Sequence, residues 1–399
     1  MKILVLNCGS SSIKYKLFDM DSKKVMAQGG IEKIGLKGSF LKLTTPDDRK
    51  VILEKNIPEH QTGVEFILSV LTSKENGCLQ SLKEIDAVGH RVVHGGEKFN
   101  SSVLINKAVM DQIVDCIDLA PLHNPSNLIG IRAVENVLPG IRQVAVFDTA
   151  FHQTMPPKAY IYGLPYCYYE KYGIRRYGFH GTSHRYVSKR ACDVLGVNYE
   201  DQRMITAHIG NGASITAIKN GKSVDTSMGM TPVDGLLMGT RSGEIDAGVL
   251  TFISEKEHLS AKGISDLLNK RSGVLGVSGV SSDMRELSAA CEQGNPRAIL
   301  AMDMFNYRIH KYVGSYAAVL GGLDILVFTG GVGENQWTTR TDVCKNLEFM
   351  GIKLDESKNT GMCGKEMIIS TPDSKVTVMV IPTNEEFMIA KDTLDILTK

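Results

Sequence analysis

The chain has 399 residues, which is long enough for two domains with separate hydrophobic cores. Its hydrophobic share of 43%, its charged share of 22% and its net charge of +1 are ordinary for a globular protein, and they exclude broad binding to nucleic acid or to a membrane surface. None of the 8 cysteines forms a Cys-x-x-Cys pair, so neither a metal finger nor a redox pair is expected, and scattered single thiols fit a reducing cytoplasm.

Patterns typical of strands and helices alternate along the chain, which predicts an α/β fold. In the first half we expect strands at residues 2–7, 12–19, 25–31, 86–93 and 142–148, an extra hairpin within 38–55, and helices at 63–73, 107–119 and 124–137. The second half repeats this order, with strands at 203–208, 214–219, 222–225 and 324–329. The apolar stretch 312–333 contains Asp324 and several glycines, so we interpret it as a helix end and a buried strand rather than a membrane span.

The two halves match each other in strand pattern and turn chemistry at two places. The strand at 4–7 and its Gly-Ser turn resemble 206–208 and its turn, and 86–88 leading to Gly95-Gly96 resembles 324–326 leading to Gly330-Gly331. Glycine-rich turns also recur by chance in α/β proteins, but here strand length and turn chemistry agree together. The sequence therefore predicts an internal duplication, with two phosphate loops that face each other across a cleft.

The segment Ile3–Lys16 predicts a buried strand, a tight turn and a second strand. The backbone N–H groups and hydroxyls of a turn with Ser10 and Ser12 can converge on a phosphate, and Lys14 adds positive charge. This strand–turn–strand arrangement differs from the strand–loop–helix of the Walker type. The segment indicates a nucleotide-dependent phosphotransferase.

Three further segments are candidates for nucleotide binding, each with a plainer alternative. His208–Ser214 ends a strand with alternating glycines, which permit close backbone approach, although its Asn-Gly pair is also a common hairpin turn. Phe328–Asn335 either leaves room for a flat ring or ribose or is a tight strand-to-helix turn. Asp283 and Arg285 could bind a ribose hydroxyl and stack on a base, but Asp283 with Glu286 also makes a good helix cap.

Four charged residues stand at the ends of apolar runs or beside glycines. Arg91 lies inside an apolar strand and Arg241 beside a glycine-rich loop, and an arginine fork suits phosphate or carboxylate. Asp148 follows a buried strand, where α/β proteins place ligands, or it merely caps the next helix. Glu385 falls in the first turn of a helix, where acidic residues are favoured in any case, so by itself it indicates no function.

Two pairs of histidines have the spacing of metal ligands on a helix. His90 and His94 fall in a strand, however, where this spacing separates the rings, and a glycine follows the first ring of the pair His180 and His184. A zinc hydrolase is therefore not favoured.

Segments spread in order over nearly the whole chain resemble the acetate kinase family of short-chain acid kinases. The matching segments are Asn7–Lys14, Gly89–Gly96, Pro121–Pro125, Phe147–His152, Tyr177–His184, His208–Ser214, Asp225–Gly229, Gly239–Arg241, Phe328–Asn335 and Thr383–Glu386. The chain departs from the usual family pattern with Glu244 for aspartate, Ala247 for proline and Val332 for isoleucine. The first two put local loop geometry in question, and the third keeps the adenine site apolar.

The resemblance implies a two-lobed, duplicated actin/sugar-kinase-like (ribonuclease H-like) α/β fold with a central cleft. It implies an N-terminal lobe over 1–150, a C-terminal nucleotide-binding lobe over 151–385, and a last helix over 386–399 that packs back on the first lobe. The implied reaction is reversible, Mg²⁺-dependent, direct in-line phosphoryl transfer from ATP to acetate, giving ADP and acetyl phosphate, with Mn²⁺ as a substitute metal. The family also implies a cytoplasmic homodimer joined through the C-terminal lobe, with neither nucleic acid nor membrane as a partner.

The resemblance also implies roles for individual residues. For catalysis and charge neutralisation these are Asn7, Arg91, Asp148, His180 and Arg241, and for the metal Asn7 and Glu385, with Asp148 nearby. Acetate would meet Arg91, Val93, Leu122, Phe179 and Pro232. The nucleotide would meet Ser10, Ser12, Lys14, His208, Ile209, Gly210, Asn211, Gly212, Asp283, Met284, Arg285, Gly331, Val332, Gly333 and Asn335.

Two other readings remain open at this point. A propionate or butyrate kinase would use identical chemistry, but Val93 favours acetate, because family members that prefer propionate tend to have a smaller residue there. A nucleotide-driven assembly or chaperone protein, as among actin relatives, would have no use for paired arginines around an acid pocket.

Overall fold

The chain folds into two compact units. The computed structural model describes residues 1–45, 47, 49–121 and 123–399. Unit 1 comprises Met1–Gln153 and Asn384–Lys399, and unit 2 comprises Thr154–Thr383. Asn384 and Glu385 therefore group with unit 1, whereas the sequence-based boundary after residue 385 placed them in the second lobe.

Unit 1 is built on a mixed sheet in the order β5-β4-β3-β2-β1-β6-β8-β7. Its strands are β1 (Lys2–Cys8), β2 (Ser12–Asp19), β3 (Lys24–Glu32), β4 (Phe40–Thr44), β5 (Lys50–Glu54), β6 (Ala87–Val92), β7 (Val103–Leu104) and β8 (Arg142–Phe147). β1 is antiparallel to β2 and parallel to β6, and β6 is parallel to β8. The hairpin expected within 38–55 is present as β4 and β5.

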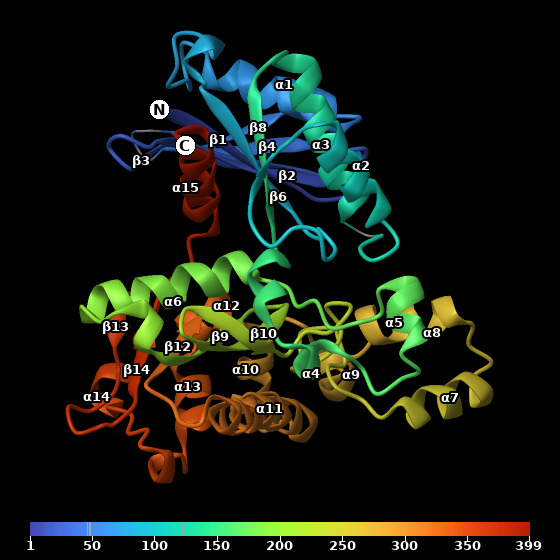
Figure 1. Ribbon diagram of the computed structural model, residues 1–399, viewed down its shortest axis with the longest axis vertical. Helices are drawn as coiled ribbons and strands as arrows, with labels where there is room; N and C mark the ends of the chain where they lie inside the picture. Colours follow the sequence, from blue (N-terminus) through green and yellow to red (C-terminus); the bar gives the residue numbers. More distant parts are fainter. Residues whose placement is uncertain (46, 48, 122) are drawn as a thin grey trace. The chain divides into compact units, whose positions relative to one another are not determined.

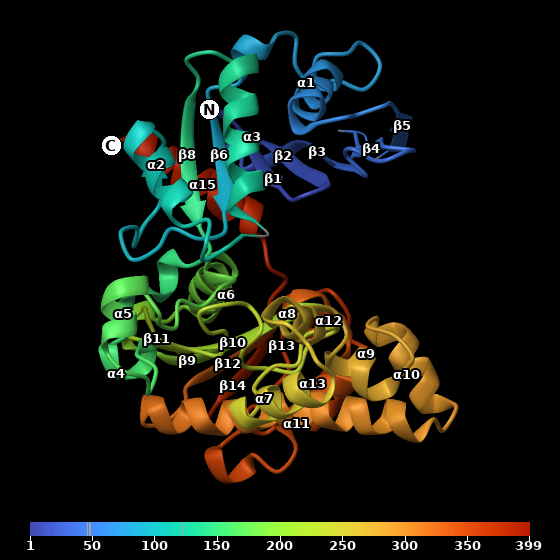
Figure 2. The ribbon, with the colours of Figure 1, turned by 90° about the vertical axis from the view of Figure 1, so that its right-hand side faces the viewer.

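Helices cover both faces of this sheet because its strands alternate between two apolar sides. Leu4 and Leu6 of β1 pack with α1 (His60–Leu71) and α3 (Asn124–Val137), whereas Ile3 and Val5 pack with α15 (Glu385–Leu397) on the opposite face. Figures 1 and 2 show α15 and the pair α1 and α3 on the two sides. α2 (Lys107–Asp115) and two short 3₁₀ helices, Leu82–Glu84 and Ala150–Thr154, complete the unit.

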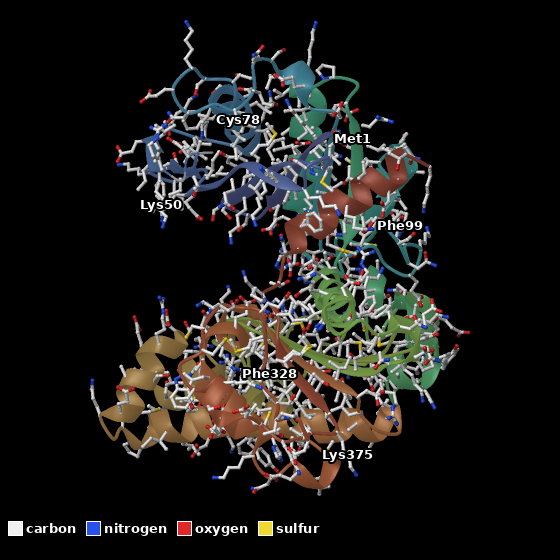
Figure 3. All side chains as sticks on the ribbon, turned by 90° about the vertical axis from the view of Figure 1, so that its left-hand side faces the viewer. Met1, Lys50, Cys78, Phe99, Phe328 and Lys375 are labelled. Carbon is white, nitrogen blue, oxygen red and sulfur yellow. The ribbon has the colours of Figure 1, made fainter. Side chains whose placement is uncertain are left out.

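Unit 2 contains a second mixed sheet, in the order β11-β10-β9-β12-β14-β13. Its strands are β9 (Arg203–Ile209), β10 (Ala213–Lys219), β11 (Lys222–Thr226), β12 (Ile325–Thr329), β13 (Met367–Ile368) and β14 (Thr377–Val380). β12 is buried over its whole length, and Phe328 near its end is labelled in Figure 3. β9 is antiparallel to β10 and parallel to β12, which is parallel to β14.

The sheet of unit 2 also lies between helices. α6 (Gly181–Leu195) and α11 (Pro296–Leu320) pack against opposite faces of it, as Figures 1 and 2 show. The other helices are α4 (Pro157–Tyr160), α5 (Cys167–Tyr172), α7 (Ala247–Lys256), α8 (Ala261–Lys270), α9 (Gly273–Ser278), α10 (Met284–Glu292), α12 (Gly330–Asn335), α13 (Trp337–Cys344) and α14 (Glu356–Asn359), with 3₁₀ turns at Tyr199–Asp201 and Glu348–Met350.

The two sheets share one topology. The strands β3-β2-β1-β6-β8 of unit 1 and β11-β10-β9-β12-β14 of unit 2 have the same order and the same pattern of antiparallel and parallel neighbours. The predicted α/β duplication is thereby confirmed, with β1 corresponding to β9 and β6 to β12. The stretch 312–333 is the end of α11 followed by β12, and among the described residues no helix is both long and apolar enough to cross a bilayer.

Candidate active site

In unit 1, polar side chains gather where three neighbouring strands end. Asn7 lies near the end of β1, Arg91 near the end of β6, and Asp148 directly after β8. Because β1, β6 and β8 run parallel and adjacent, their carboxyl ends share one edge of the sheet. Sequence alone placed Asn7 and Asp148 at strand ends and Arg91 inside a strand, and the strand order brings the three together.

Arg91 is held by Asp148 through two of its three nitrogens. Its Nε lies 3.1 Å from both carboxylate oxygens of Asp148, and its Nη2 lies 2.5 Å from Oδ2. Its Nη1 lies 3.4 Å from Oδ1 of Asn7. Asp148 is buried, so this pairing supplies the charge that a buried carboxylate needs. Both carboxylate oxygens of Asp148 accept hydrogen bonds from Arg91, so these contacts favour an ion pair over a helix cap.

Burial alone would lower the pKa of Arg91, but the negative charges of Asp148 and Glu385 outweigh it and raise that pKa above its usual range. Arg91 is therefore a fixed cation. Its pairing with Asp148 leaves the edge formed by Nη1 and Nη2 as the side of the fork that can meet a second anion.

Glu385 is the first residue of α15 and is half-buried. Burial is the largest cause that raises the pKa of its carboxyl to about 7, and the nearby charges of Asp148 and Glu386 raise it further against the opposing effect of Arg91. Glu386 instead pairs with Lys16 at 3.1 Å. The helix turn explains why an acid stands here, but it does not explain a carboxyl placed next to a second acid, which is an arrangement that favours a bound cation.

Val93 follows β6 and is buried. Its backbone N–H donates to Oδ1 of Asn127 at 3.0 Å, and Nδ2 of Asn127 donates to the carbonyl of Cys8, also at 3.0 Å. Asn127, on α3, thus fixes the ends of β1 and β6 relative to each other, a role that the sequence reasoning missed. Leu122, predicted beside Val93 in the acid pocket, lies outside the described residues.

The predicted phosphate loop is the turn between β1 and β2. The backbone N–H of Gly9 donates to the carbonyl of Ser12 at 2.9 Å, and Nε2 of His60 is 2.7 Å from the carbonyl oxygen of Gly9. Ser10 and Lys14 are exposed, and Ser12 is half-buried. The side chains of Ser10, Ser12 and Lys14 are therefore accessible to a ligand, and hydrogen bonds fix the turn that carries them.

In unit 2, His180 opens α6 with a backbone conformation that favours glycine. Its φ is 57° and its ψ 21°, which for a residue with a side chain is strained. Its Nδ1 lies 2.9 Å from Oγ of Ser214, and its ring stacks on that of His208 with centroids 4.3 Å apart. Phe179, before it, is buried. Strain of this kind persists at sites where the surrounding contacts fix a side chain for a function.

Two cationic or donor groups converge on the backbone of Gly212. A Cβ placed on Gly212 would lie 3.3 Å from Nη1 of Arg241 and 3.7 Å from Nε2 of His180. Burial lowers the pKa of Arg241, and among the described residues no carboxylate forms an ion pair with it. Within the described residues, its Nη1 hydrogen-bonds to the carbonyl of Pro232, at 3.5 Å, and to the sulfur of Met238. A half-buried guanidinium without an acidic partner is suited to an incoming anion.

The three predicted nucleotide segments form one hollow of about 690 Å³ in unit 2. It lies where the β9–β10 loop meets the starts of α10 and α12. Its lining is Gly210, Asn211, Asp283, Met284, Arg285, Ser288, Gly331, Val332, Asn335 and Gln336. Sequence reasoning missed Ser288 and Gln336, which bond to each other at 3.0 Å. Gln336 directly follows the segment Phe328–Asn335, and Ser288 lies about one helical turn after Arg285, so these positions could have indicated them.

Some predicted nucleotide residues support the hollow rather than line it. Gly333 and Ile209 are buried behind it, and a Cβ on Gly333 would lie 3.6 Å from Cβ of Ile209. His208 bonds through Nδ1 to Oγ of Ser183 at 2.8 Å. Asp283 caps α10 and pairs with Arg285 at 2.6 Å, a hydrogen bond that lowers the pKa of Asp283 to about 2.

The half-buried Glu334 and the buried Arg340 fix the floor of the hollow. Glu334 accepts hydrogen bonds from the backbone N–H of Gly330 at 2.8 Å and of Thr383 at 3.1 Å. The fully buried Arg340 donates to the carbonyls of Gly333 and Met362 at 2.9 and 2.7 Å. A single sequence does not reveal these roles, because both residues act through distant backbone groups.

The histidine pairs do not make a metal site. His90 is buried against Gln143 at 2.8 Å, and burial lowers its pKa to about 4. Nδ1 of His94 accepts from the backbone N–H of Gly96. In the part of the chain that the structure describes, no three His, Cys, Asp or Glu side chains are grouped so that they alone could hold a metal ion.

Comparison with known proteins decides the family. The model of the Acetokinase family matches residues 2–391. The acetate kinase of Parabacteroides distasonis is 71% identical over 399 residues, and that of Bacteroides thetaiotaomicron is 69% identical over 399 residues, with 100% of both chains covered in each case. This chain belongs to the acetate kinase family. The resemblance read from its motifs is confirmed.

Solved structures of the acetate kinase family have the same fold. The crystal structure of Porphyromonas gingivalis acetate kinase matches with a TM-score of 0.96 at 66% identity, over 99% of each chain. A propionate kinase from Francisella tularensis matches with a TM-score of 0.91 at 43% identity, over 98% of each chain.

The structure shows the surroundings of two of the three departures from the family pattern. Glu244 pairs with Arg308 at 3.0 Å, and Val332 lines the hollow.

Proposed function

We propose that this protein transfers the γ-phosphoryl group of ATP to acetate, reversibly and directly, forming ADP and acetyl phosphate. The observation that carries the proposal is the arrangement in unit 2, where the hollow reaches the β9–β10 loop and Arg241 and His180 converge on Gly212 of that loop. A hollow for a nucleoside that leads to a fixed cation and a ring nitrogen is what phosphoryl transfer requires.

The chemistry needs alignment and charge neutralisation rather than a general base. A carboxylic acid such as acetate titrates near ~4–5, so at pH 7 its oxygen is already a charged nucleophile. Arg241 and Nε2 of His180 meet the charge that spreads over the phosphoryl oxygens in the transition state. Asp148 acts through Arg91, whose fork it orients.

We assign the nucleoside to the hollow of unit 2. Gly331 and Val332 give the flat ring an apolar wall, Asp283 and Asn335 offer oxygens to the ribose, and Arg285 lies over the base. The backbone of the β9–β10 loop, from His208 to Gly212, binds the phosphates. In unit 1, the turn with Ser10, Ser12 and Lys14 offers hydrogen-bond donors and positive charge that suit a phosphate.

We assign acetate to Arg91 and its apolar neighbours. The free edge of the Arg91 fork holds the carboxylate, and Val93 forms the wall beside the methyl group in unit 1. Val93 is buried and its backbone is held by Asn127, which suits a wall that measures the length of an acid.

Magnesium fits the oxygen groups of unit 1. Asn7, Asp148 and Glu385 offer oxygen ligands, which Mg²⁺ and Mn²⁺ both accept, and the charge of Asp148 raises the pKa of Glu385, an effect that a bound cation would offset. With so few protein ligands, Asn7 and Glu385 would hold the ion together with water and the phosphates of ATP. The ion would supply positive charge to the phosphates, and Glu385 and Asn7 position it.

We also propose a homodimer that forms through unit 2 and a cytoplasmic location. Phe252 on α7 and Leu300, Tyr307 and Val319 on α11 are at least half exposed, and such apolar side chains favour association. All eight cysteines are free thiols, which suits a reducing compartment. Light scattering of wild type and Tyr307→Asp tests the dimer: a monomeric wild type contradicts it, and an unchanged dimer in the variant places it elsewhere.

An acid panel tests the proposed function. The protein is incubated with ATP, Mg²⁺ and acetate, propionate or butyrate, and the acyl phosphate is trapped with hydroxylamine. We expect the highest kcat/KM with acetate, and lower values with each added methylene. A preference for propionate would make the protein a propionate kinase, and hydrolysis of ATP without any trapped product would contradict an acid kinase.

A further inference from the structure

A chain of hydrogen bonds runs through the interior of unit 2 to His180. Oγ1 of Thr206 lies 2.7 Å from Nδ1 of His184, whose Nε2 lies 2.8 Å from Oγ of Ser214. Ser214 in turn lies 2.9 Å from Nδ1 of His180. Thr206, His184 and Ser214 are completely buried, on β9, α6 and β10 respectively. None of these three residues is needed to bind a substrate directly.

The direction of this chain follows from its buried end. Within the described part of the molecule, the Thr206 hydroxyl has one hydrogen bond to any side chain or backbone group, and that bond is to Nδ1 of His184. A buried hydroxyl proton without an acceptor is costly, so Thr206 must donate, and Nδ1 of His184 must be the bare, accepting nitrogen. The ring proton of a neutral His184 is then on Nε2, and it donates to Ser214.

The same reasoning fixes the next two steps. Ser214 accepts from Nε2 of His184, so its own proton is available for its second partner, Nδ1 of His180. A His180 that accepts at Nδ1 carries its proton on Nε2. That nitrogen is the one near Gly212 and Arg241. The opposite polarity would leave the Thr206 proton buried without an acceptor.

We infer that Thr206, His184 and Ser214 are positioning residues that hold His180 in the tautomer with the proton on Nε2, so that a neutral His180 presents a hydrogen-bond donor. This inference rests on the proposed function, in which that donor meets a phosphoryl oxygen. The chain also explains how His180 keeps a strained backbone, because its ring is fixed from the buried side. A wrong tautomer in such an arrangement is costly even when the geometry stays intact.

The decisive measurement reads the tautomer directly. In the protein with ¹⁵N-labelled histidines and no substrate, the shifts and couplings of the two ring nitrogens distinguish a protonated nitrogen from a bare one. His180 is assigned by the loss of its signals in His180→Gln. We expect protonated Nε2 and bare Nδ1 in both His180 and His184. A proton on Nδ1 of His180 in the wild type overturns the inference without any variant having to fold.

Variants then test whether the chain causes the tautomer. Thr206→Val removes the terminal hydroxyl and keeps the shape, and it should mix the tautomers of His180 and lower kcat at least ~10-fold with little change in either KM. Thr206→Ser should restore both. The matched control is Thr216→Val. Thr216 is equally buried on β10, and its hydroxyl bonds to Thr226, which is not part of the hydrogen-bond chain to His180.

Two outcomes would end the inference. One is an unchanged His180 tautomer in both Thr206→Val and Ser214→Ala, and the other is a mixed tautomer that leaves kcat unaltered. Failure of the acid panel is a separate result, since the tautomer is read without substrate and stands or falls independently of the reaction.

Discussion

Each unit carries one arginine that we assign to the reaction, and the surroundings of the two differ. Arg91 lies near the end of β6, and Arg241 lies in the segment between β11 and α7. In unit 1, Arg91 is gripped by the buried carboxylate of Asp148. In unit 2, Arg241 has no ion-pair partner among the described residues, and its neighbours are a carbonyl, a sulfur and the backbone of Gly212. Arg91 is therefore a cation whose charge is balanced by a fixed partner, whereas the charge of Arg241 has no counter-charge paired with it in the described part of the chain.

The wider surroundings differ in the same sense. Unit 1 gathers oxygens of Asn7, Asp148 and Glu385 around its arginine, which suits a cation as well as an anion. Unit 2 gathers neutral hydroxyls and imidazoles, such as Ser214 and His180, and the backbone of a glycine loop. One topology thus provides an ionic half and a neutral, hydrogen-bonding half. The comparison teaches that strand order fixes where polar side chains gather but not whether their charges are paired.

Removing each arginine is the strongest test of this contrast. Arg91→Ala and Arg241→Ala should each lower kcat at least ~10²-fold, because each removes charge that meets the transition state. Their effects on stability should diverge. Arg91→Ala leaves Asp148 buried and unpaired and should cost about 3 kcal/mol of unfolding free energy, while Arg241→Ala should cost less than about 1 kcal/mol. Urea unfolding measures both, and equal losses would contradict the contrast.

The matched relief variant is Arg91→Ala combined with Asp148→Asn. It should recover much of the lost stability without recovering activity, because the buried charge is gone but the cation is still absent.

Glu385 tests the ionic character of unit 1 through pH. With a pKa of about 7, the carboxyl is protonated below that pH and must lose its proton to hold Mg²⁺, so the Mg²⁺ concentration for half-maximal activity should rise about tenfold from pH 8 to pH 6. Glu385→Gln should need more Mg²⁺ at every pH and lose this dependence. Magnesium titrations at four pH values measure it.

Glu386→Gln is the control for that titration. It should keep the dependence with a midpoint at lower pH, because Glu386 is one of the charges that raise the pKa of Glu385. A Glu385→Gln enzyme that titrates with magnesium like the wild type would remove Glu385 from the metal site.

Val93 sharpens the assignment of the acid to unit 1. Val93→Ala should enlarge the pocket and shift the ratio of kcat/KM for propionate over acetate by roughly tenfold, the value of about one methylene in an apolar pocket. Competition of the two acids in one hydroxamate assay measures the ratio. An identical ratio in both enzymes would show that Val93 is not a wall of the pocket.

The smallest expected effect concerns the hollow of unit 2. Gly331 lines it, and a Cβ there would meet no protein atom within 4 Å, so Gly331→Ala should leave folding intact and raise the KM for ATP about fivefold by filling ligand space. Gly314→Ala on α11 is the control, because its Cβ is equally unobstructed but lies on another helix. An unchanged KM for ATP in Gly331→Ala would place the nucleoside elsewhere.

Much of this architecture could be predicted from the sequence because local patterns carry it. The strand at 12–19 and the helix at 124–137 were predicted with the bounds that the structure has, since each is a clear apolar pattern bounded by turn residues. The duplication was visible because both halves combine an apolar strand with the same turn chemistry. The family was visible because its motifs lie in contiguous segments.

The rest could not be read from the sequence, because it depends on pairings between distant residues. Nothing near Asp148 indicates Arg91 as its partner, 57 positions away. The sequence around Glu385 indicates only an acid at a helix start, because its proximity to Asp148 and Arg91 depends on the packing of α15 against the strands of unit 1. Asn127, Glu334 and Arg340 bind distant backbone groups, which leave no pattern in their own surroundings.

By itself, the sequence determined the elements, the repeat and the chemistry on offer, because backbone preference and hydrophobic period act over a few residues. Only the tertiary structure decided which charges are neutralised and which nitrogen of His180 carries the proton. Those properties come from burial. A buried polar group without a partner is costly, so the fold determines which partner it has and which of the two atoms donates.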